Sequence, residues 1–192
     1  KEAPIFQRER LAGLKIAPYV LSKAVVLTLL VVIQSMVLLG IVSAKVALPE
    51  YGLIGSIEFD IFMTTLLSSI AGLALGLLIS TVASTPDRAI SIVPLALIPQ
   101  IVLSGVIFRL EGAAQTLSWL AIGRWSMDAY GAIIDLNSLP HLAGGVPVSP
   151  AYEEYTAEPG HLASRWVIMF VYTAVCLGLT TWLLRRKDQH SE

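Results

Sequence analysis

Four long apolar segments dominate the pattern of hydrophobic and polar positions along the chain. They cover residues 24–44, 59–83, 89–108 and 166–184. Each is close to the length of about 20 residues that an α-helix needs to cross a bilayer. Polar residues separate them, with Lys45 after the first segment and a connector containing Pro49 after that. The pattern therefore predicts an all-α integral membrane protein with four transmembrane helices.

The third segment differs from the other three because Pro94 and Pro99 lie inside it. Gln100 follows Pro99 directly. Each proline removes a backbone hydrogen bond and bends a helix, so neighbouring helices or a wet cavity must satisfy the freed carbonyls. Gln100 is then either an interhelical hydrogen-bonding residue or part of a substrate path. The turn before this segment, residues 84–88, offers Thr85 or Asp87 as a helix cap.

Two stretches outside these segments also have helical features. Residues 1–23 mix basic and apolar positions, which indicates either a membrane-surface helix or a helix that docks on another protein. Residues 109–165 begin with two short apolar pieces, divided by Gly112 and Gly123, which are too short to cross a bilayer and suit re-entrant external helices. The Pro- and Gly-rich second half, residues 137–160, predicts a solvated loop.

Composition supports lipid as the solvent. The chain has 192 residues, of which 55% are hydrophobic and 14% charged, whereas a soluble domain carries about 25% charge. The net charge of −1 says nothing about nucleic acid, but the sequence has no basic cluster interleaved with aromatic residues, so nucleic acid is not an expected partner. Cys176 is the only cysteine and forms no intrachain disulfide. A start at Lys1 without a signal-peptide pattern leads us to expect a piece of a longer polypeptide.

The distribution of positive charge predicts the orientation in the membrane. With four spans, nine of the thirteen basic residues fall on one side, including Arg88 in the tight turn and Arg185 and Arg186 near the end of the chain. Because cytoplasmic loops are rich in Lys and Arg, we expect both ends of the chain to be cytoplasmic and residues 109–165 to be external. The expected location is the plasma (inner) membrane, crossed several times.

The sequence carries no pattern of an enzyme active site. Serine-hydrolase, zinc-protease and phosphate-binding-loop motifs are absent, and the three histidines are scattered. The spans hold no Asp or Glu at mid-depth, since Asp60 lies at an end, and intramembrane chemistry usually needs such a group. We therefore expect a non-enzyme whose energy source lies outside this sequence.

Two stretches resemble the G-subfamily of ABC transporters, especially bacterial members that fuse ATPase and permease. The first resembles the cytoplasmic loop of that family: Ile5-Phe6-x-Arg8-Glu9-Arg10, Gly13-Leu14 and Tyr19-Val20-Leu21-Ser22-Lys23. The second resembles a gate-forming span followed by re-entrant helices: Pro99-Gln100, Ser104-Gly105, Leu117-Ser118-Trp119-Leu120 and Arg124-Trp125-Ser126-Met127-Asp128-Ala129. The similarity covers nearly the whole chain.

The resemblance implies that residues 1–192 are a partial permease domain containing the last four of six spans. It implies a homodimer with a path for lipid-like or drug-like substrates between its halves, in contact with membrane lipid. ATP and Mg²⁺ would bind an ABC ATPase domain, in the same polypeptide or separate, so no cofactor is expected in this chain. The external loop lacks the cysteines that brace many eukaryotic members, and its order is expected from packing of Trp119, Trp125 and Tyr130.

The resemblance also assigns roles to individual residues. The cytoplasmic loop corresponds to a coupling helix within residues 1–23, with an ATPase contact made by Phe6, Arg8, Glu9, Arg10 and Leu14. The predicted translocation path is lined by Gln34, Thr65, Ser68, Gln100, Ile101 and Leu103. The outer gate maps to Val106 and Ile107.

Two other interpretations fit the same four spans. A polysaccharide-exporting ABC permease would share the span pattern and would have a wide, aromatic-lined channel. A non-transporting membrane anchor or assembly subunit would depend on no ATPase and would need no polar path.

Overall fold

The computed structural model describes residues 16–83, 85–105, 110, 112–136 and 155–189, and within them the protein consists of α-helices joined by turns and short connectors. This confirms the predicted all-α membrane class. The helices of these residues are α2 (Ile16–Lys45), α3 (Ile57–Val82), α4 (Pro86–Val102), α5 (Ala113–Ser118), α6 (Ile122–Ile133) and α7 (Pro159–Gln189).

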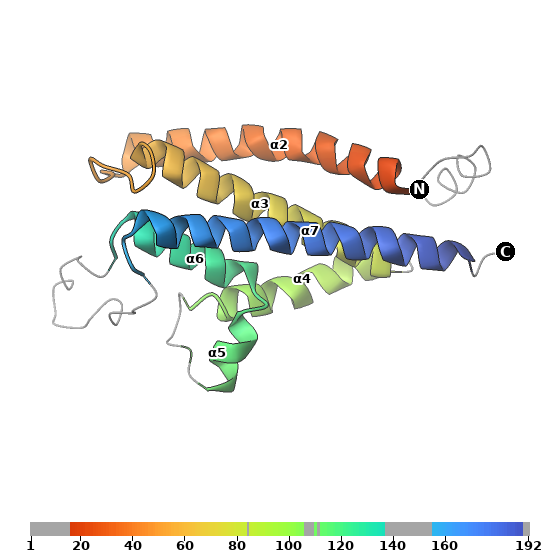
Figure 1. Ribbon diagram of the computed structural model, residues 1–192. Coiled ribbons are helices and arrows are strands. Elements are labelled where there is room, and N and C mark those ends of the chain that lie inside the picture. Colours follow the sequence, from red (N-terminus) through yellow and green to blue (C-terminus); the bar gives the residue numbers. More distant parts are fainter. Residues whose placement is uncertain (1–15, 84, 106–109, 111, 137–154, 190–192) are drawn as a thin grey trace.

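Three helices form a long bundle. Helices α2, α3 and α7 are long and apolar enough to cross a membrane, over Leu21–Lys45, Ile57–Val82 and Pro159–Arg186. Helix α3 packs against both of the others. The first turn of α2, the last turn of α3, the first turn of α4 and the last turn of α7 lie at one end of the bundle (Figure 1). Segments that run antiparallel to one another in succession would place these four helix ends together, as predicted.

Helix α2 begins earlier than the sequence predicted. It starts at Ile16, so its first eight residues belong to the segment 1–23 that the sequence separated from the first span. Pro18 lies in its first turn. A proline is tolerated there because the N–H groups of a first turn have no intrahelical partner to lose. The surface segment and the first span are therefore continuous over these residues.

Helix α4 is shorter than the third predicted span. It ends at Val102, whereas the prediction extended to residue 108. Its 17 residues, with Pro94 and Pro99 inside the helix, rise about 26 Å, less than the ~30 Å hydrocarbon core. The chain then turns at Leu103–Ser104 and reaches Gly105 at a φ of 80°, a left-handed conformation that glycine adopts easily. The helix therefore ends inside the predicted segment.

The caps of α3 and α4 are set by short polar side chains. Thr85 caps α4, as one of the two predicted alternatives, because its hydroxyl accepts from the N–H of Arg88 at 3.3 Å. Ser56 caps α3 in the same way through the N–H of Phe59. Each cap satisfies a donor that the first helical turn leaves without a partner.

Asp60 anchors the connector between α2 and α3. Its carboxylate is fully buried and accepts hydrogen bonds from the N–H groups of Leu53 at 2.6 Å, Ile54 at 3.1 Å and Gly55 at 3.2 Å. Gly52 also lies close, since an added Cβ there would be 2.7 Å from a carboxylate oxygen of Asp60. The position that the sequence placed merely at the end of a span therefore organises the loop.

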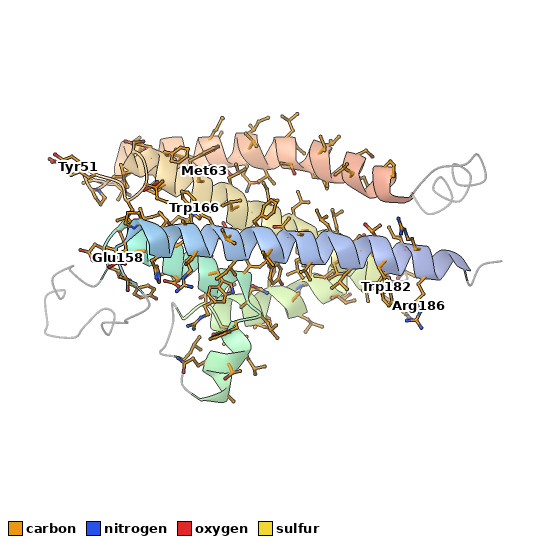
Figure 2. All side chains as sticks on the ribbon, viewed as in Figure 1. Tyr51, Met63, Glu158, Trp166, Trp182 and Arg186 are labelled. Carbon is orange, nitrogen blue, oxygen red and sulfur yellow. The ribbon has the colours of Figure 1, made fainter. Side chains whose placement is uncertain are left out.

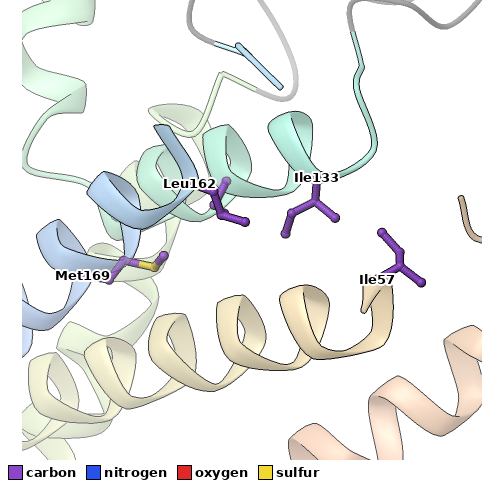
Figure 3. Packing of buried hydrophobic residues seen from close by; sticks show 5 residues of the cluster. Ile57, Ile133, Leu162 and Met169 are labelled. Atoms are coloured by element: carbon purple, nitrogen blue, oxygen red, sulfur yellow. The ribbon is translucent and has the colours of Figure 1, made fainter. Parts of the chain in front are cut away.

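The core lies where α3, α6 and α7 meet. Its buried cluster consists of Ile57, Ala129, Ile133, Leu162 and Met169 (Figure 3). Helix α6 lies against the ring of the buried Tyr155 at Gly131. An added Cβ at Gly131 would be 2.5 Å from that ring, so this close contact requires glycine. This cluster fixes α6 against the two long helices.

Apolar side chains cover the outside of the bundle, as expected for a lipid-facing surface (Figure 2). At one end lie Tyr51 and Trp166, and at the opposite end Trp182 and Arg186 (Figure 2). The guanidinium carbon of Arg186 is 5.5 Å from the centroid of the Trp182 ring. Because tryptophan, tyrosine and arginine favour membrane–water interfaces, these residues mark the two ends of the apolar band.

Candidate functional site

The candidate site is the polar junction where α6 meets α3, α4 and α7. We define this junction by its hydrogen-bonded side chains: Thr64, Thr65, Gln100, Asp128, Tyr130, His161, Arg165 and Trp166. Two of the four helices that form it, α3 and α4, carry residues of the predicted path. The contacts in this junction therefore show which of the predicted residues the fold brings together.

Adjacent threonines on α3 bind the two neighbouring helices. The indole N–H of Trp166 on α7 donates to the hydroxyl of Thr64 at 2.9 Å. The hydroxyls of Thr65 and Tyr130, on α6, are 2.6 Å apart. Since Thr65 already donates its single proton to the carbonyl of Ile61 at 2.7 Å, the phenol of Tyr130 is the donor in that pair.

Burial favours the neutral form of this phenol. Desolvation raises the pKa of Tyr130 above its ordinary value of 10, and the hydrogen bonds with Thr65 and Ser68 oppose that rise only in part. Tyr130 therefore stays a hydrogen-bond donor at neutral pH.

We expect the Tyr130→Phe substitution to lower stability by about 1 kcal/mol, because it keeps the ring but removes the hydrogen bond that the phenol donates to Thr65, together with the weaker interaction with Ser68. Thr65 keeps its bond to Ile61 and is not left unsatisfied. Thermal unfolding in detergent micelles measures the effect. The exposed Tyr51→Phe variant is the matched control and should melt like the parent protein. Equal melting of both variants would show that the Tyr130 bond contributes nothing.

An ion pair joins α6 to the first turns of α7. The carboxylate of Asp128 accepts from Nε of Arg165 through Oδ2 and lies 2.9 Å from Nε2 of His161 through Oδ1. The Asp128 side chain is 5% exposed, and the partners are 19% and 15% exposed. His161 and Arg165 are four residues apart on one face of α7, so a single carboxylate holds both.

The sequence predicts no role for His161 or Arg165, and Asp128 belongs only to a stretch that resembles the family. The spacing of His161 and Arg165 is a signal for a shared partner, but nothing local points to Asp128, which lies 33 residues before His161.

Aromatic residues order the segment between α4 and α6. The indole N–H of Trp125 donates to the carbonyl of Trp119 at 3.0 Å, and the two rings meet edge to face at 6.2 Å. Arg124 donates to the buried hydroxyl of Ser118 at 2.9 Å, while Arg165 lies 5.2 Å from the Trp125 ring. Of the predicted aromatic packing, the contact between Trp119 and Trp125 is present, whereas Tyr130 is bonded to Thr65 on α3.

Gln100 connects the end of α4 to the start of α6. Its side-chain oxygen accepts from the N–H of Gly123 at 3.3 Å. The sequence placed Gly123 between two helical pieces, but it lies in the first turn of α6, and the break falls at residues 119–121. An added Cβ at Gly123 would be 2.6 Å from the backbone oxygen of Gln100. Glycine is therefore needed for close approach rather than for breaking the helix.

The structure brings some predicted path residues together and separates others. Thr65 and Gln100 both contact α6, whereas Gln34 is exposed on α2. Ser68 donates to the carbonyl of Thr65 at 3.0 Å and is half-buried. Ile101 is exposed and Leu103 is half-buried. A role for these residues in a substrate path stays a prediction.

Seven predicted site residues lie outside the described part of the chain: Phe6, Arg8, Glu9, Arg10, Leu14, Val106 and Ile107. In the part that is described, no group of three His, Cys, Asp or Glu side chains is placed to hold a metal ion.

Comparison with known proteins identifies the family. A family model described as ABC-2 type transporter matches residues 1–134, which contain α2 to α6. The chain belongs to the ABC-2 type transporter family. It is an ABC-2 membrane domain, and the resemblance to ABC permeases noted in the sequence is confirmed.

One relative extends the match through α7. The ABC-2 domain is 27% identical over 194 residues to the ABC transporter ATP-binding/permease protein Rv1747 of Mycobacterium tuberculosis. The alignment covers 97% of this chain and 22% of that protein. The chain thus spans about a fifth of the relative's length. No solved structure gives a significant match.

Proposed function

We propose that this ABC-2 domain forms the translocation path of an ATP-driven exporter for a lipid-like or hydrophobic substrate, working by alternating access. The family match is the observation that carries the proposal. The apolar, proline-containing α4 and the polar junction beside it support a path that accepts hydrophobic cargo. Threonine and glutamine hydroxyl and amide groups offer neutral hydrogen bonds without the cost of a charge in lipid.

ATP hydrolysis is assigned to a nucleotide-binding domain outside these residues. The 192 residues contain no phosphate-binding loop of the G-x-x-x-x-G-K-[ST] type, so ATP and Mg²⁺ bind that partner domain. The name of the Mycobacterium tuberculosis relative joins ATP-binding and permease functions in one protein, which supports a partner on the same polypeptide. The homodimer and the contact with membrane lipid belong to the same proposal.

The orientation proposed is with both ends of the segment in the cytoplasm and the α2–α3 connector outside. Arg88, Arg185 and Arg186 lie toward the end of the bundle where α4 begins and α7 finishes. The acidic residues Glu50, Glu58 and Glu158 lie toward the opposite end. This charge asymmetry supports a cytoplasmic basic end and an inner-membrane location.

Residues 1–23 are proposed to couple the ATPase to the path. Arg8, Glu9 and Arg10 offer charge-assisted hydrogen bonds to a partner surface, and Phe6 and Leu14 offer apolar anchors. Because α2 is one continuous helix from Ile16, a movement of this segment is transmitted directly to the first span.

The experiment is an Arg8→Ala, Glu9→Ala double substitution in the full-length protein. We expect ATP-dependent export from reconstituted vesicles to fall at least about tenfold, as loss of two charge-assisted bonds predicts, while ATP hydrolysis and membrane insertion persist. An Arg185→Ala variant, in an exposed residue at the other end of the chain, is the control. Export at the parental rate in the double variant would contradict the coupling role.

A further inference from the structure

The helices around the polar junction are not held equally firmly. Helix α6 is fixed to α7 by the Asp128–Arg165 ion pair and to α3 by the Tyr130–Thr65 hydrogen bond. The apolar cluster Ile57, Ala129, Ile133, Leu162 and Met169 draws its members from these same three helices. Helices α3, α6 and α7 therefore share one core.

Helix α4 stands outside that core. No described residue of α4 is buried, and the buried cluster and the partly buried side chains packed on it include none of its residues. Pro94 and Pro99 remove two backbone hydrogen bonds from its second half, which makes that half easier to bend. Figure 1 shows α4 crossing the lower side of the bundle and leading to α5, which projects away from it.

A side chain of α4 caps the N-terminus of α6. The residue at the N-cap position of α6 is Ala121, which makes no side-chain cap hydrogen bond. The oxygen of Gln100 instead accepts from Gly123, at the second position of α6. Because Gly123 has no side chain, the backbone of α4 can approach this closely. The contact is neutral and local, so it can break and re-form without exposing a buried charge.

We propose that α3, α6 and α7 move as one unit during transport and that α4 moves relative to them. The hydrogen bond between Gln100 and Gly123 is then the contact that breaks and re-forms. Gln100 is then a positioning residue that holds α4 in its closed position. This inference rests on the proposed function and adds which helix moves.

The test uses pulsed electron–electron distance measurements on the full-length protein in nanodiscs, with Cys176 replaced by alanine. One labelled pair, Leu97→Cys with Val171→Cys, reports α4 against α7. A second pair, Val82→Cys near the end of α3 with Val167→Cys near the start of α7, reports α3 against α7. All four positions are exposed. Each pair is measured without nucleotide and after trapping with ATP, Mg²⁺ and vanadate, with labelled protomers diluted by unlabelled ones.

We expect the α4–α7 distance to shift by more than the width of its distribution on trapping, while the α3–α7 distance stays constant. A Gln100→Ala variant should broaden the α4–α7 distribution without nucleotide, because the cap is lost. The matched control Gln115→Ala, an exposed glutamine of α5, should leave both distributions unchanged.

Export measured on the same preparations separates this inference from the proposed function. Active export with an unchanged α4–α7 distance, or with an equal shift in both pairs, would overturn the moving-helix proposal and leave the transporter intact. An unchanged distribution in Gln100→Ala would overturn the role of Gln100. Absence of ATP-dependent export together with fixed distances would overturn both proposals.

Discussion

The Asp128→Ala substitution is expected to destabilise this ABC-2 domain by about 3–5 kcal/mol, because it leaves the largely buried Arg165 without its carboxylate. His161 loses its partner at the same time. Removing one member of a buried ion pair costs more than the pair itself contributes, since the remaining charge must stay desolvated. Thermal unfolding in detergent micelles, followed by near-ultraviolet circular dichroism, should show a much lower midpoint.

Matched variants define the cause of this loss. Glu158→Ala removes an exposed carboxylate next to the start of α7 and should cost less than about 1 kcal/mol. Asp128→Asn keeps the shape and one acceptor oxygen, so its loss should be smaller than that of Asp128→Ala. Combining Asp128→Ala with Arg165→Ala should recover part of the loss, because the unpaired charge is gone. Additive losses in the double variant would show that the two residues act independently.

The Asp60→Ala substitution is expected to cost about 3 kcal/mol and to loosen the connector between α2 and α3. It removes the acceptor of three backbone N–H groups at once, and each unsatisfied donor costs roughly 1–3 kcal/mol unless water replaces the carboxylate. The connector is partly exposed, so water will satisfy some of these donors. The loss should appear in thermal unfolding and as faster amide exchange of Leu53, Ile54 and Gly55.

Glu58→Ala is the control for Asp60, because Glu58 is an exposed carboxylate in the same first turn of α3. It should leave amide exchange in the connector unchanged. Gly52→Ala provides an independent route to the same disruption, since its Cβ would lie 2.7 Å from an Asp60 oxygen. Slow exchange of the connector amides in Asp60→Ala would contradict the anchoring role.

These two carboxylates illustrate which residues sequence reasoning could not assign. The sequence places Asp60 only at the end of a span and Asp128 only within a stretch that resembles the family. Their roles depend on groups that come together when helices pack: a connector folded back on α3 for Asp60, and two side chains of α7 for Asp128. The apolar spans around them carry no local signal of either contact.

The predicted path residues show the same limit. The sequence left Gln100 either as a hydrogen-bonding residue between helices or as part of a path, and the structure gives it a bond to Gly123. A hydrogen bond between helices does not decide whether the residue also meets substrate. Thr65 is similar, because its partner Tyr130 lies 65 residues away in the chain.

The sequence by itself determined the helical class, the lipid environment, the cap of α4 as one of two alternatives, and three of the spans, because these depend on apolar runs of sufficient length and on contacts within a few residues. The tertiary structure decided the early end of α4, the joint between α4 and α6, and the polar bonds of α6 to α3 and α7. These contacts join residues between 23 and 65 positions apart. Their formation depends on how helices pack, which local periodicity does not encode.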